Sequence, residues 1–296
     1  MSPTLLRHLS IIDALAIGFA GVILLFFLKA FSATPYWAVL LVITPLFVVF
    51  PLLAARLRAR SVFSSVQKLI QFLYPIVFLF SIFESFFMIL PYFNPRRYDQ
   101  FLTDIDHALF GVHPTLWMQQ WTLPWLTELM YIVYFLYFPM PLLPVIYLYR
   151  QRDWKTLERT LFIYLVCYFG GYIGYFLFPA SGPRHYLSEL QTVPLRGVFL
   201  SETIRQFIDF LEPNKLDVFP SLHASIVITT LLITYSVHRI MFNWFVPLAV
   251  AILISLIYCR YHYVIDILAG ILWALASFWV SNVVYARYHK LFTPHF

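Results

Sequence analysis

The sequence predicts an all-α, polytopic membrane protein, and three observations lead to that fold class. Of the 296 residues, 61% are hydrophobic and only 11% are charged, whereas a water-soluble chain of this length exposes far more charge. The mean hydropathy is +0.78. Apolar runs of about 20 residues recur along the chain, which is the length of a helix that crosses a hydrocarbon core of roughly 30 Å.

Eight of these runs are predicted to be transmembrane helices. Two longer mixed stretches, 91–124 and 180–218, interrupt them. The first is rich in tryptophan and proline and is expected to lie along the membrane interface, where amphipathic rings settle. The approximate ranges of the predicted helices are 11–30, 36–54, 69–90, 125–149, 160–179, 219–237, 244–261 and 264–286.

The basic residues indicate the orientation of the chain. With the amino terminus inside, the inner segments hold twelve of the 20 Lys and Arg residues, which is the bias of cytoplasmic loops. Both termini are therefore expected in the cytoplasm. The formal net charge of +6 does not predict a nucleic-acid partner, because the basic residues lie mostly in short loops between apolar runs. The two cysteines, Cys167 and Cys259, are expected to be buried apolar fillers.

This orientation brings three distant segments to the outer membrane boundary. They are the 180–218 stretch, the start of the sixth span at 219–225, and the junction of the last two spans at 255–270. If the helices crossed the other way, these groups would not share that side. The polar residues of the three segments form the predicted site: Arg184, Ser221, His223, Arg260, His262 and Asp266.

These residue types are suited to cleavage of a phosphate ester, which needs a nucleophile, an acid for the leaving oxygen and fixed positive charge. A neutral imidazole can attack phosphorus, which makes His262 the predicted nucleophile. Asp266 follows four residues later, on the same helix face, and is expected to orient that ring. His223 is then available to protonate the leaving oxygen.

The remaining predicted residues would bind the phosphate. Arg184 and Arg260 present planar donor forks, and Ser221 opens the sixth helix, whose free N–H groups attract anions. Taken singly, an interfacial histidine is more often a polar anchor, and an arginine near a span end more often reaches toward lipid headgroups. The occurrence of all three segments on one side favours a site.

Two blocks of this set resemble signatures of the type 2 phosphatidic acid phosphatase superfamily. Residues 255–270 resemble its third signature, Ser-Arg-x5-His-x3-Asp, and residues 219–224 resemble its second, Pro-Ser-Gly-His. The resemblance implies that His262 forms a phosphohistidine, that Asp266 orients it and that His223 is the general acid. It also implies chemistry without a metal or other cofactor. Because it covers the last six spans, it implies a six-helix catalytic core at 61–296, preceded by two helices at 1–60.

The sequence departs from the superfamily pattern in ways that are similar to its inositol phosphorylceramide synthase branch. The first signature, Lys-x6-Arg-Pro, is absent, with Leu177 standing seven residues before Arg184. Leu222 replaces a glycine, and Leu256 replaces the arginine that follows the serine of the third signature. Residues 104–114 also look like that branch. Its members move a phosphorylated headgroup from one lipid to another.

The expected function is therefore phosphate or phospho-headgroup transfer from a lipid phosphate or glycerophospholipid, within the bilayer. The site is expected to face the periplasm, the extracellular side or an organelle lumen. Hydrolysis to water by the same site is one alternative, because both reactions share a phosphoenzyme. A membrane transporter is another, since Glu84 lies inside the predicted third span and several spans are rich in glycine and proline.

Overall fold

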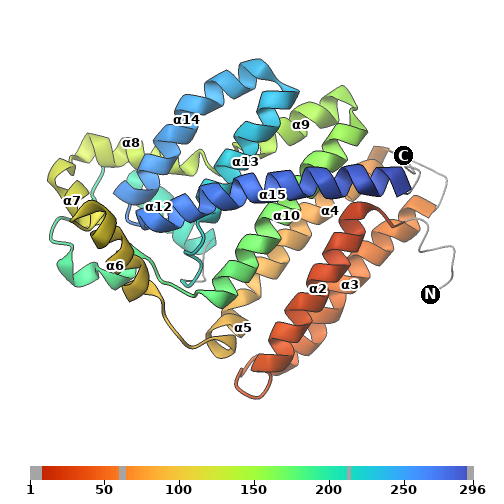
Figure 1. The fold of residues 1–296 in the computed structure, drawn as a ribbon, viewed down its shortest axis with the longest axis horizontal. Coiled ribbons are helices and arrows are strands. Elements are labelled where there is room, and N and C mark those ends of the chain that lie inside the picture. The colour runs from red at the N-terminus through yellow and green to blue at the C-terminus, as the bar shows by residue number, and fades with distance from the viewer. Residues whose placement is uncertain (1–8, 60–64, 212–214, 292–296) are drawn as a thin grey trace.

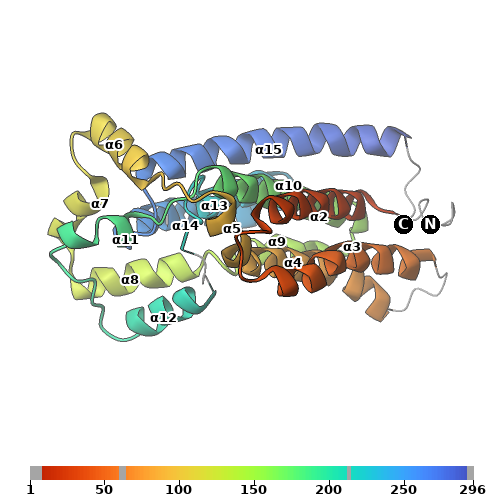
Figure 2. The ribbon, with the colours of Figure 1, turned by 90° about the horizontal axis from the view of Figure 1, so that it is seen from below.

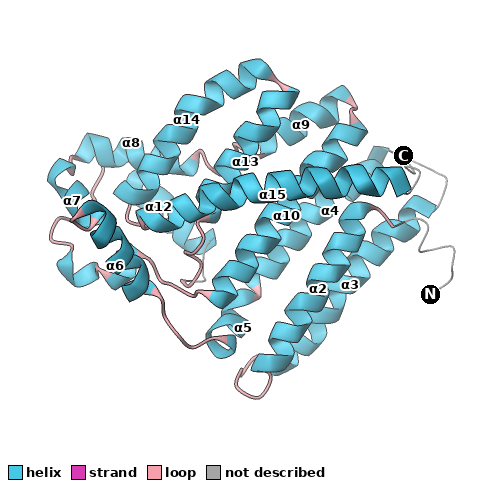
Figure 3. Cartoon of the chain, viewed as in Figure 1, coloured by secondary structure: helices cyan, strands magenta, loops and turns pink. Residues whose placement is uncertain are grey.

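The computed structural model describes residues 9–59, 65–211 and 215–291, and over these ranges the regular structure is helical (Figure 3). The exception is one isolated β-bridge between Ala180 and Asp217. The predicted all-α fold class is confirmed for the part of the chain that the structure describes.

The chain begins with a hairpin of two apolar helices, α2 (Ile11–Ala30) and α3 (Trp37–Ala59) (Figure 1). Ser10 and Asp13 form a capping box at the start of α2, which satisfies two of the N–H groups that a helix start leaves unpaired. Large apolar side chains are exposed along the outer faces of both helices, as is expected of helices whose solvent is lipid.

The third predicted span, 69–90, is divided in the structure. Helix α4 (Ser65–Glu84) ends beside Ser85, and α5 (Phe86–Phe93) follows it. The hydroxyl and the backbone N–H of Ser85 both donate to the carbonyl of Ile82, at 2.6 and 3.0 Å, so the chain closes α4 with a tight turn at this residue. Glu84 is consequently placed at a helix end.

The fourth predicted span, 125–149, is also divided, into α8 (Pro124–Phe135) and α9 (Leu142–Gln151). Pro139 and Pro141 lie in the turn between the two helices, and neither can donate the N–H that a continuous helix needs. Short helices occupy the mixed stretch before α8, namely α6 (Asp99–Phe110), α7 (Pro114–Trp117) and the 3-10 helix η1 (Met118–Trp121).

Four helices surround the predicted site residues: α10 (Trp154–Leu177), α13 (Leu222–Val237), α14 (Arg239–Tyr258) and α15 (Val264–Leu291). Helix α13 packs against the other three, and α15 crosses α10 (Figures 1 and 2). Close approach requires glycine: a Cβ at Gly270 of α15 would collide with the backbone of Ser221 at the start of α13.

The outer stretch between α10 and α13 holds α11 (Pro183–Tyr186), the 3-10 helix η2 (Ser188–Leu190) and α12 (Ser201–Leu211). Helix α12 packs against α8 (Figure 2). It presents Phe207 and Phe210 at the surface, which is typical of a helix that lies in the membrane interface.

Five helices among the described residues are long and apolar enough to cross a bilayer, within 11–30, 37–57, 154–177, 239–258 and 264–290. Two shorter apolar helices, Phe72–Glu84 and Leu222–Val237, accompany them. The chain is thus a multi-pass helical membrane protein. The count of eight spans stays a prediction, because the third and fourth are each divided.

The start of the described chain and the end of α15 lie together, since the Tyr288 hydroxyl donates to the carbonyl of Leu9 at 3.1 Å. This arrangement agrees with two termini on one side of the membrane. The predicted boundary between 1–60 and 61–296 falls on residues outside those described, and the division stays a prediction. Helices α2 and α3 share one apolar core with α4, α5 and α10.

Candidate active site

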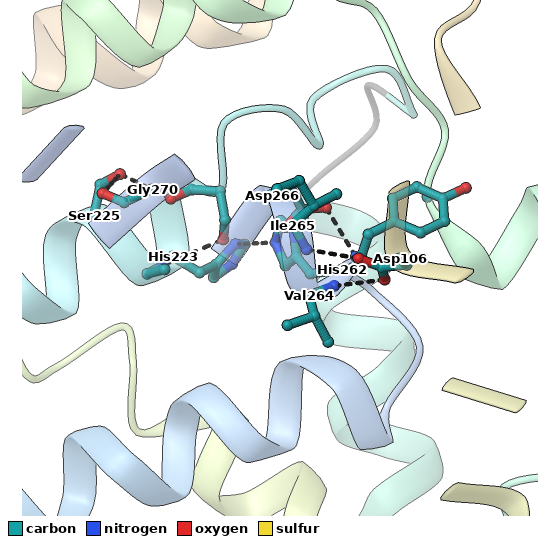
Figure 4. A network of polar contacts seen from close by, with 12 residues as sticks. Asp106, His223, Ser225, His262, Val264, Ile265, Asp266 and Gly270 are labelled. Atoms are coloured by element: carbon teal, nitrogen blue, oxygen red, sulfur yellow. Dashed lines mark hydrogen bonds and ion pairs between the residues drawn. The ribbon is translucent and has the colours of Figure 1, made fainter. Parts of the chain in front are cut away.

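Two histidines from distant parts of the sequence meet at the start of α13 and α15 (Figure 4). His223 Nδ1 lies 3.0 Å from His262 Nε2, and the ring centroids are 5.1 Å apart. His223 stands in the first turn of α13, and His262 lies two residues before the start of α15. The predicted meeting of these side chains is therefore present in the fold.

Asp266 lies on the far side of the His262 ring. Its Oδ1 is 3.0 Å from His262 Nδ1, and the side chains of Asp266 and His262 are only 0% and 3% exposed. The other carboxylate oxygen accepts the backbone N–H of Tyr263 at 2.8 Å, which fixes the carboxyl group. A proton on Nδ1, facing Asp266, leaves the Nε2 lone pair directed toward His223.

His223 is positioned by a tyrosine that sequence reasoning missed. The Tyr134 hydroxyl in α8 lies 2.9 Å from His223 Nε2, and the Tyr137 ring centroid lies 4.4 Å from that of His223. Both His223 nitrogens therefore have defined neighbours. The sequence contains 20 tyrosines, and no spacing singles out these two.

A small polar pocket borders both imidazoles, with a volume of about 40 Å³. One water position needs roughly 10–15 Å³, so the pocket offers about three such positions, comparable to the oxygens of a phosphoryl group. Two nitrogens 3.0 Å apart leave no room for a phosphorus atom directly between them. The residues around this polar pocket include Arg184, His185, Lys215, His223, Tyr261 and His262.

Arg184, one of the predicted phosphate ligands, does border the polar pocket. Its guanidinium donates to both carboxylate oxygens of Asp209 in α12, at 2.7 and 2.9 Å, and to the Tyr261 hydroxyl at 2.9 Å. Burial alone would raise the pKa of Asp209, but the hydrogen bonds and charge of Arg184 hold it below its ordinary value. Asp209 therefore stays ionised and holds the guanidinium in place.

Lys215 supplies a second cation to the polar pocket, and sequence reasoning missed it. Its Nζ lies 3.5 Å from Asp209. Burial lowers the pKa of neighbouring His185, and the charges of Arg184 and Lys215 lower it further. A lysine thus borders the polar pocket although position 177, seven residues before Arg184, is a leucine. Lys215 lies eight residues before His223, and this spacing matches no motif in the sequence.

Arg260, the second predicted arginine, does not border the polar pocket. It is buried, and its guanidinium donates to Gln191 Oε1 at 3.2 Å and to the carbonyl of Val193 at 2.6 Å. Its backbone lies in the left-handed region, with a φ of 63°, which turns the chain between α14 and α15. Arg260 therefore anchors the 191–193 loop instead of reaching the two histidines.

Ser221 likewise does not border the polar pocket. It is buried and caps α13, its hydroxyl accepting the N–H of Ala224 at 3.2 Å. Its own backbone N–H donates to the carbonyl of Asp266 at 3.0 Å. Ser221 thus joins the starts of α13 and α15, so it fixes the separation of the two histidines.

Two aspartates of α6 that sequence reasoning did not select hold the same region. Asp99 accepts the backbone N–H groups of Ser181 and Gly182, each at 2.9 Å, and the Tyr263 hydroxyl at 3.0 Å. Gly182 has a φ of 80°, a conformation that favours glycine. Asp99 therefore ties the turn before Arg184 to the segment that carries His262.

Asp106 provides the N-terminal cap of α15 from a different helix. Its two carboxylate oxygens accept the N–H groups of Val264 and Ile265, both at 2.8 Å (Figure 4). Burial raises the pKa of Asp106, and the two backbone hydrogen bonds oppose that rise. Because α15 begins at these residues, Asp106 sets where the helix carrying Asp266 starts.

Replacing Asp106 with alanine is expected to destabilise the protein by about 1–2 kcal/mol, since a lost cap costs roughly that amount, and to lower activity with it. Thermal unfolding in detergent micelles measures the change. Asp104→Ala is the matched control: Asp104 lies on the same helix but is exposed and accepts from Gln100, a residue of α6 itself. Equal unfolding temperatures for the two variants would refute the capping role.

Comparison with known proteins identifies the family to which the chain belongs. The family model described as the PAP2 superfamily, that of the type 2 phosphatidic acid phosphatases, matches residues 100–280. These residues include α13, α14, most of α15 and every predicted site residue. Because the match covers more than half of the chain, the protein belongs to the PAP2 superfamily, a family of lipid phosphatases and phosphotransferases.

One curated relative is the phosphoinositol dihydroceramide synthase of Bacteroides thetaiotaomicron. It is 28% identical over 162 residues, which are 49% of this chain and 52% of the relative. The chain thus spans about half the length of the curated relative that it matches. The resemblance to the inositol phosphorylceramide synthase branch is confirmed by this relative. No solved structure matches the chain.

Proposed function

We propose that the protein is a lipid phosphotransferase that moves a phosphate or phospho-headgroup through a phosphohistidine on His262. The observation that carries the proposal is the succession of contacts from His223 to His262 and from His262 to Asp266, with 3.0 Å between the facing atoms of each pair. This arrangement offers a nucleophilic nitrogen, a carboxylate to stabilise its developing charge and an acid beside it.

In the first half-reaction, the lone pair of His262 Nε2 forms a bond to phosphorus while the bond from phosphorus to the leaving oxygen breaks. The leaving oxygen takes its proton from protonated His223, and Asp266 stabilises the charge that His262 acquires. In the second half-reaction, an acceptor hydroxyl gives its proton to His223 and attacks phosphorus, and the N–P bond breaks. His223 thus donates one proton and recovers one in each cycle.

Fixed positive charge beside the reacting phosphorus would come from Arg184 and Lys215. Both border the polar pocket together with the two imidazoles, where donors aimed at the phosphoryl oxygens stabilise charge that develops in the transition state. Arg260 and Ser221, by contrast, are assigned to holding the loop and the helix starts, on the contacts described above.

Transfer to a lipid hydroxyl is favoured over hydrolysis by two observations. The curated relative carries the name of a synthase, and a mainly apolar cavity adjoins the polar pocket, where lipid is better accommodated than water. Hydrolysis by the same residues is the alternative. The basic inner segments support a site at the non-cytoplasmic face of the membrane.

A product assay in detergent tests the proposal. The purified protein is incubated with a headgroup-labelled glycerophospholipid and with candidate lipid acceptors, and mass spectrometry identifies the labelled product. Label on an acceptor lipid is the expected result, and labelled free headgroup phosphate would indicate hydrolysis. A transporter would give neither product, which would refute the enzyme assignment.

Activity is expected to persist in excess EDTA. The reason is that side chains at the polar pocket, Arg184 and Lys215, are positioned to supply the charge that a divalent cation supplies in many phosphoryl transfers. The measurement is the initial rate before and after dialysis against the chelator. A complete loss that added magnesium restores would contradict the proposed division of roles.

A further inference from the structure

A second cavity, much larger and mainly apolar, adjoins the polar pocket. Its volume is about 290 Å³, close to the lower end of the roughly 300–1,000 Å³ typical of small-ligand sites. Its walls come from α4, the α8–α9 turn and α10. His223 and Asp217 border both cavities, so the two form one site with a polar end and an apolar end.

The walls of the apolar cavity include apolar side chains that are also exposed, on helices whose solvent is expected to be lipid. Phe80 of α4 and Leu142 of α9 both line it, and they are 52% and 42% exposed. An apolar chain in the bilayer can therefore enter between these helices without crossing water. The occupant of the cavity is therefore expected to be an apolar chain from the bilayer.

From these observations, and resting on the proposed phosphotransferase function, we infer that this cavity holds a hydrocarbon chain of the phosphorylated lipid donor, with α4 forming the wall that selects the chain. The ligand that fits both compartments has a phosphate at one end and an apolar chain beginning beside His223. Burial of that chain is favourable because the walls of the cavity are mainly apolar.

The wall formed by α4 lies outside the residues that the family model matches. The family match begins at residue 100, whereas α4 ends at Glu84, so the match itself assigns no role to this wall. Ile76, Leu79 and Phe83 of α4 line the cavity together with Leu165 of α10. A larger side chain at this wall shortens the space for the hydrocarbon without touching the histidines.

The test compares two neighbouring substitutions, Ile76→Trp and Val77→Trp. Ile76 lines the cavity, whereas Val77 does not and is 58% exposed. The probes are dioleoyl phosphatidic acid, with long chains, and dibutyryl phosphatidic acid, with short ones. The quantity measured is the ratio of kcat/KM for release or transfer of phosphate from the two probes, determined within each protein.

Ile76→Trp is expected to lower the long-to-short ratio at least about tenfold, because one extra or missing methylene in an apolar pocket changes kcat/KM by roughly 10–200-fold. Val77→Trp is expected to leave the ratio within about twofold of the wild-type value. Partial misfolding lowers both rates together and does not change the ratio. An unchanged ratio for Ile76→Trp, or an equal change in both variants, would overturn the inference.

Photo-crosslinking gives a second readout that does not need turnover. Phosphatidic acid with a diazirine at the end of one chain is irradiated with the wild-type protein, and the labelled peptides are mapped. Label on α4 and α10, lost in Ile76→Trp and kept in Val77→Trp, is the expected result. Crosslinking without any phosphate transfer would contradict the proposed function alone, whereas transfer with label elsewhere would contradict this inference alone.

Discussion

Replacing His262 with asparagine is expected to lower kcat by roughly 10⁴-fold or more. The substitution removes the nitrogen that forms the covalent bond to phosphorus, and it leaves only substrate binding and electrostatic stabilisation. The introduced amide is similar to imidazole in polarity, but its nitrogen has no lone pair that can attack. The measurement is the steady-state rate with a long-chain lipid phosphate, together with KM, which is expected to change far less than kcat.

His238→Asn is the control for this experiment. His238 is remote in function, since its ring accepts the N–H of Met241 and caps α14 at 3.0 Å. Asparagine is also a favourable N-cap residue, so this variant is expected to retain wild-type activity. If His262→Asn kept more than about a tenth of the activity, an attack by this imidazole would be excluded.

Replacing His223 with alanine is expected to cost about 10²–10⁴-fold with a lipid substrate, the usual contribution of a general acid or base. The loss should depend on the leaving group. A nitrophenyl phosphate ester expels an oxygen that needs no proton, so formation of the phosphoenzyme should be largely spared. The second step still needs His223 to accept a proton from the acceptor.

The expected signature of His223→Ala is therefore a burst of nitrophenolate, equivalent to the amount of enzyme, followed by slow turnover. Stopped-flow absorbance measures the burst, and wild-type protein provides the reference. An equal loss for lipid and nitrophenyl substrates, with no burst, would show that His223 does not act on the leaving oxygen. The main role of His223 would then be structural, through its contact with the Tyr134 hydroxyl.

The long spans were predictable from the sequence, and the interruptions were only partly so. Hydropathy predicts α2, α3, α10, α14 and α15, because an uninterrupted apolar run of spanning length is rarely anything other than a transmembrane helix. Hydropathy carries no information on residues such as proline, which lack the backbone N–H that a continuous helix needs. Pro139 and Pro141 were visible signals of the break between α8 and α9, whereas neither proline nor glycine marks the break at Ser85.

At the site, sequence spacing predicted the residues joined by a helix turn or a signature block. His262 lies two residues before α15 and Asp266 lies in its first turn, and the four-residue spacing places the facing atoms of the two side chains 3.0 Å apart. Spacing gave no sign of where the Arg260 side chain, predicted to bind phosphate, is directed. Helix α14 ends at Tyr258, and the left-handed turn at Arg260 directs its side chain to the 191–193 loop.

The residues that the sequence did not reveal are those brought in by tertiary structure alone. Asp99, Asp106 and Tyr134 come from α6 and α8 and contact the site across large sequence separations. Their residue types are common, and their spacing relative to the histidines carries no information. Buried carboxylates are costly to place without partners such as backbone N–H groups, which is why Asp99 and Asp106 each have them in the fold.

Trapping the phosphoenzyme tests the central claim most directly. The protein is mixed with phosphatidic acid carrying a labelled phosphate, quenched in base and digested for mass spectrometry. The account predicts label on His262, stable in base and lost in acid, and absent from His262→Asn. Turnover without labelled His262, or label on a different residue that His262→Asn retains, would contradict it.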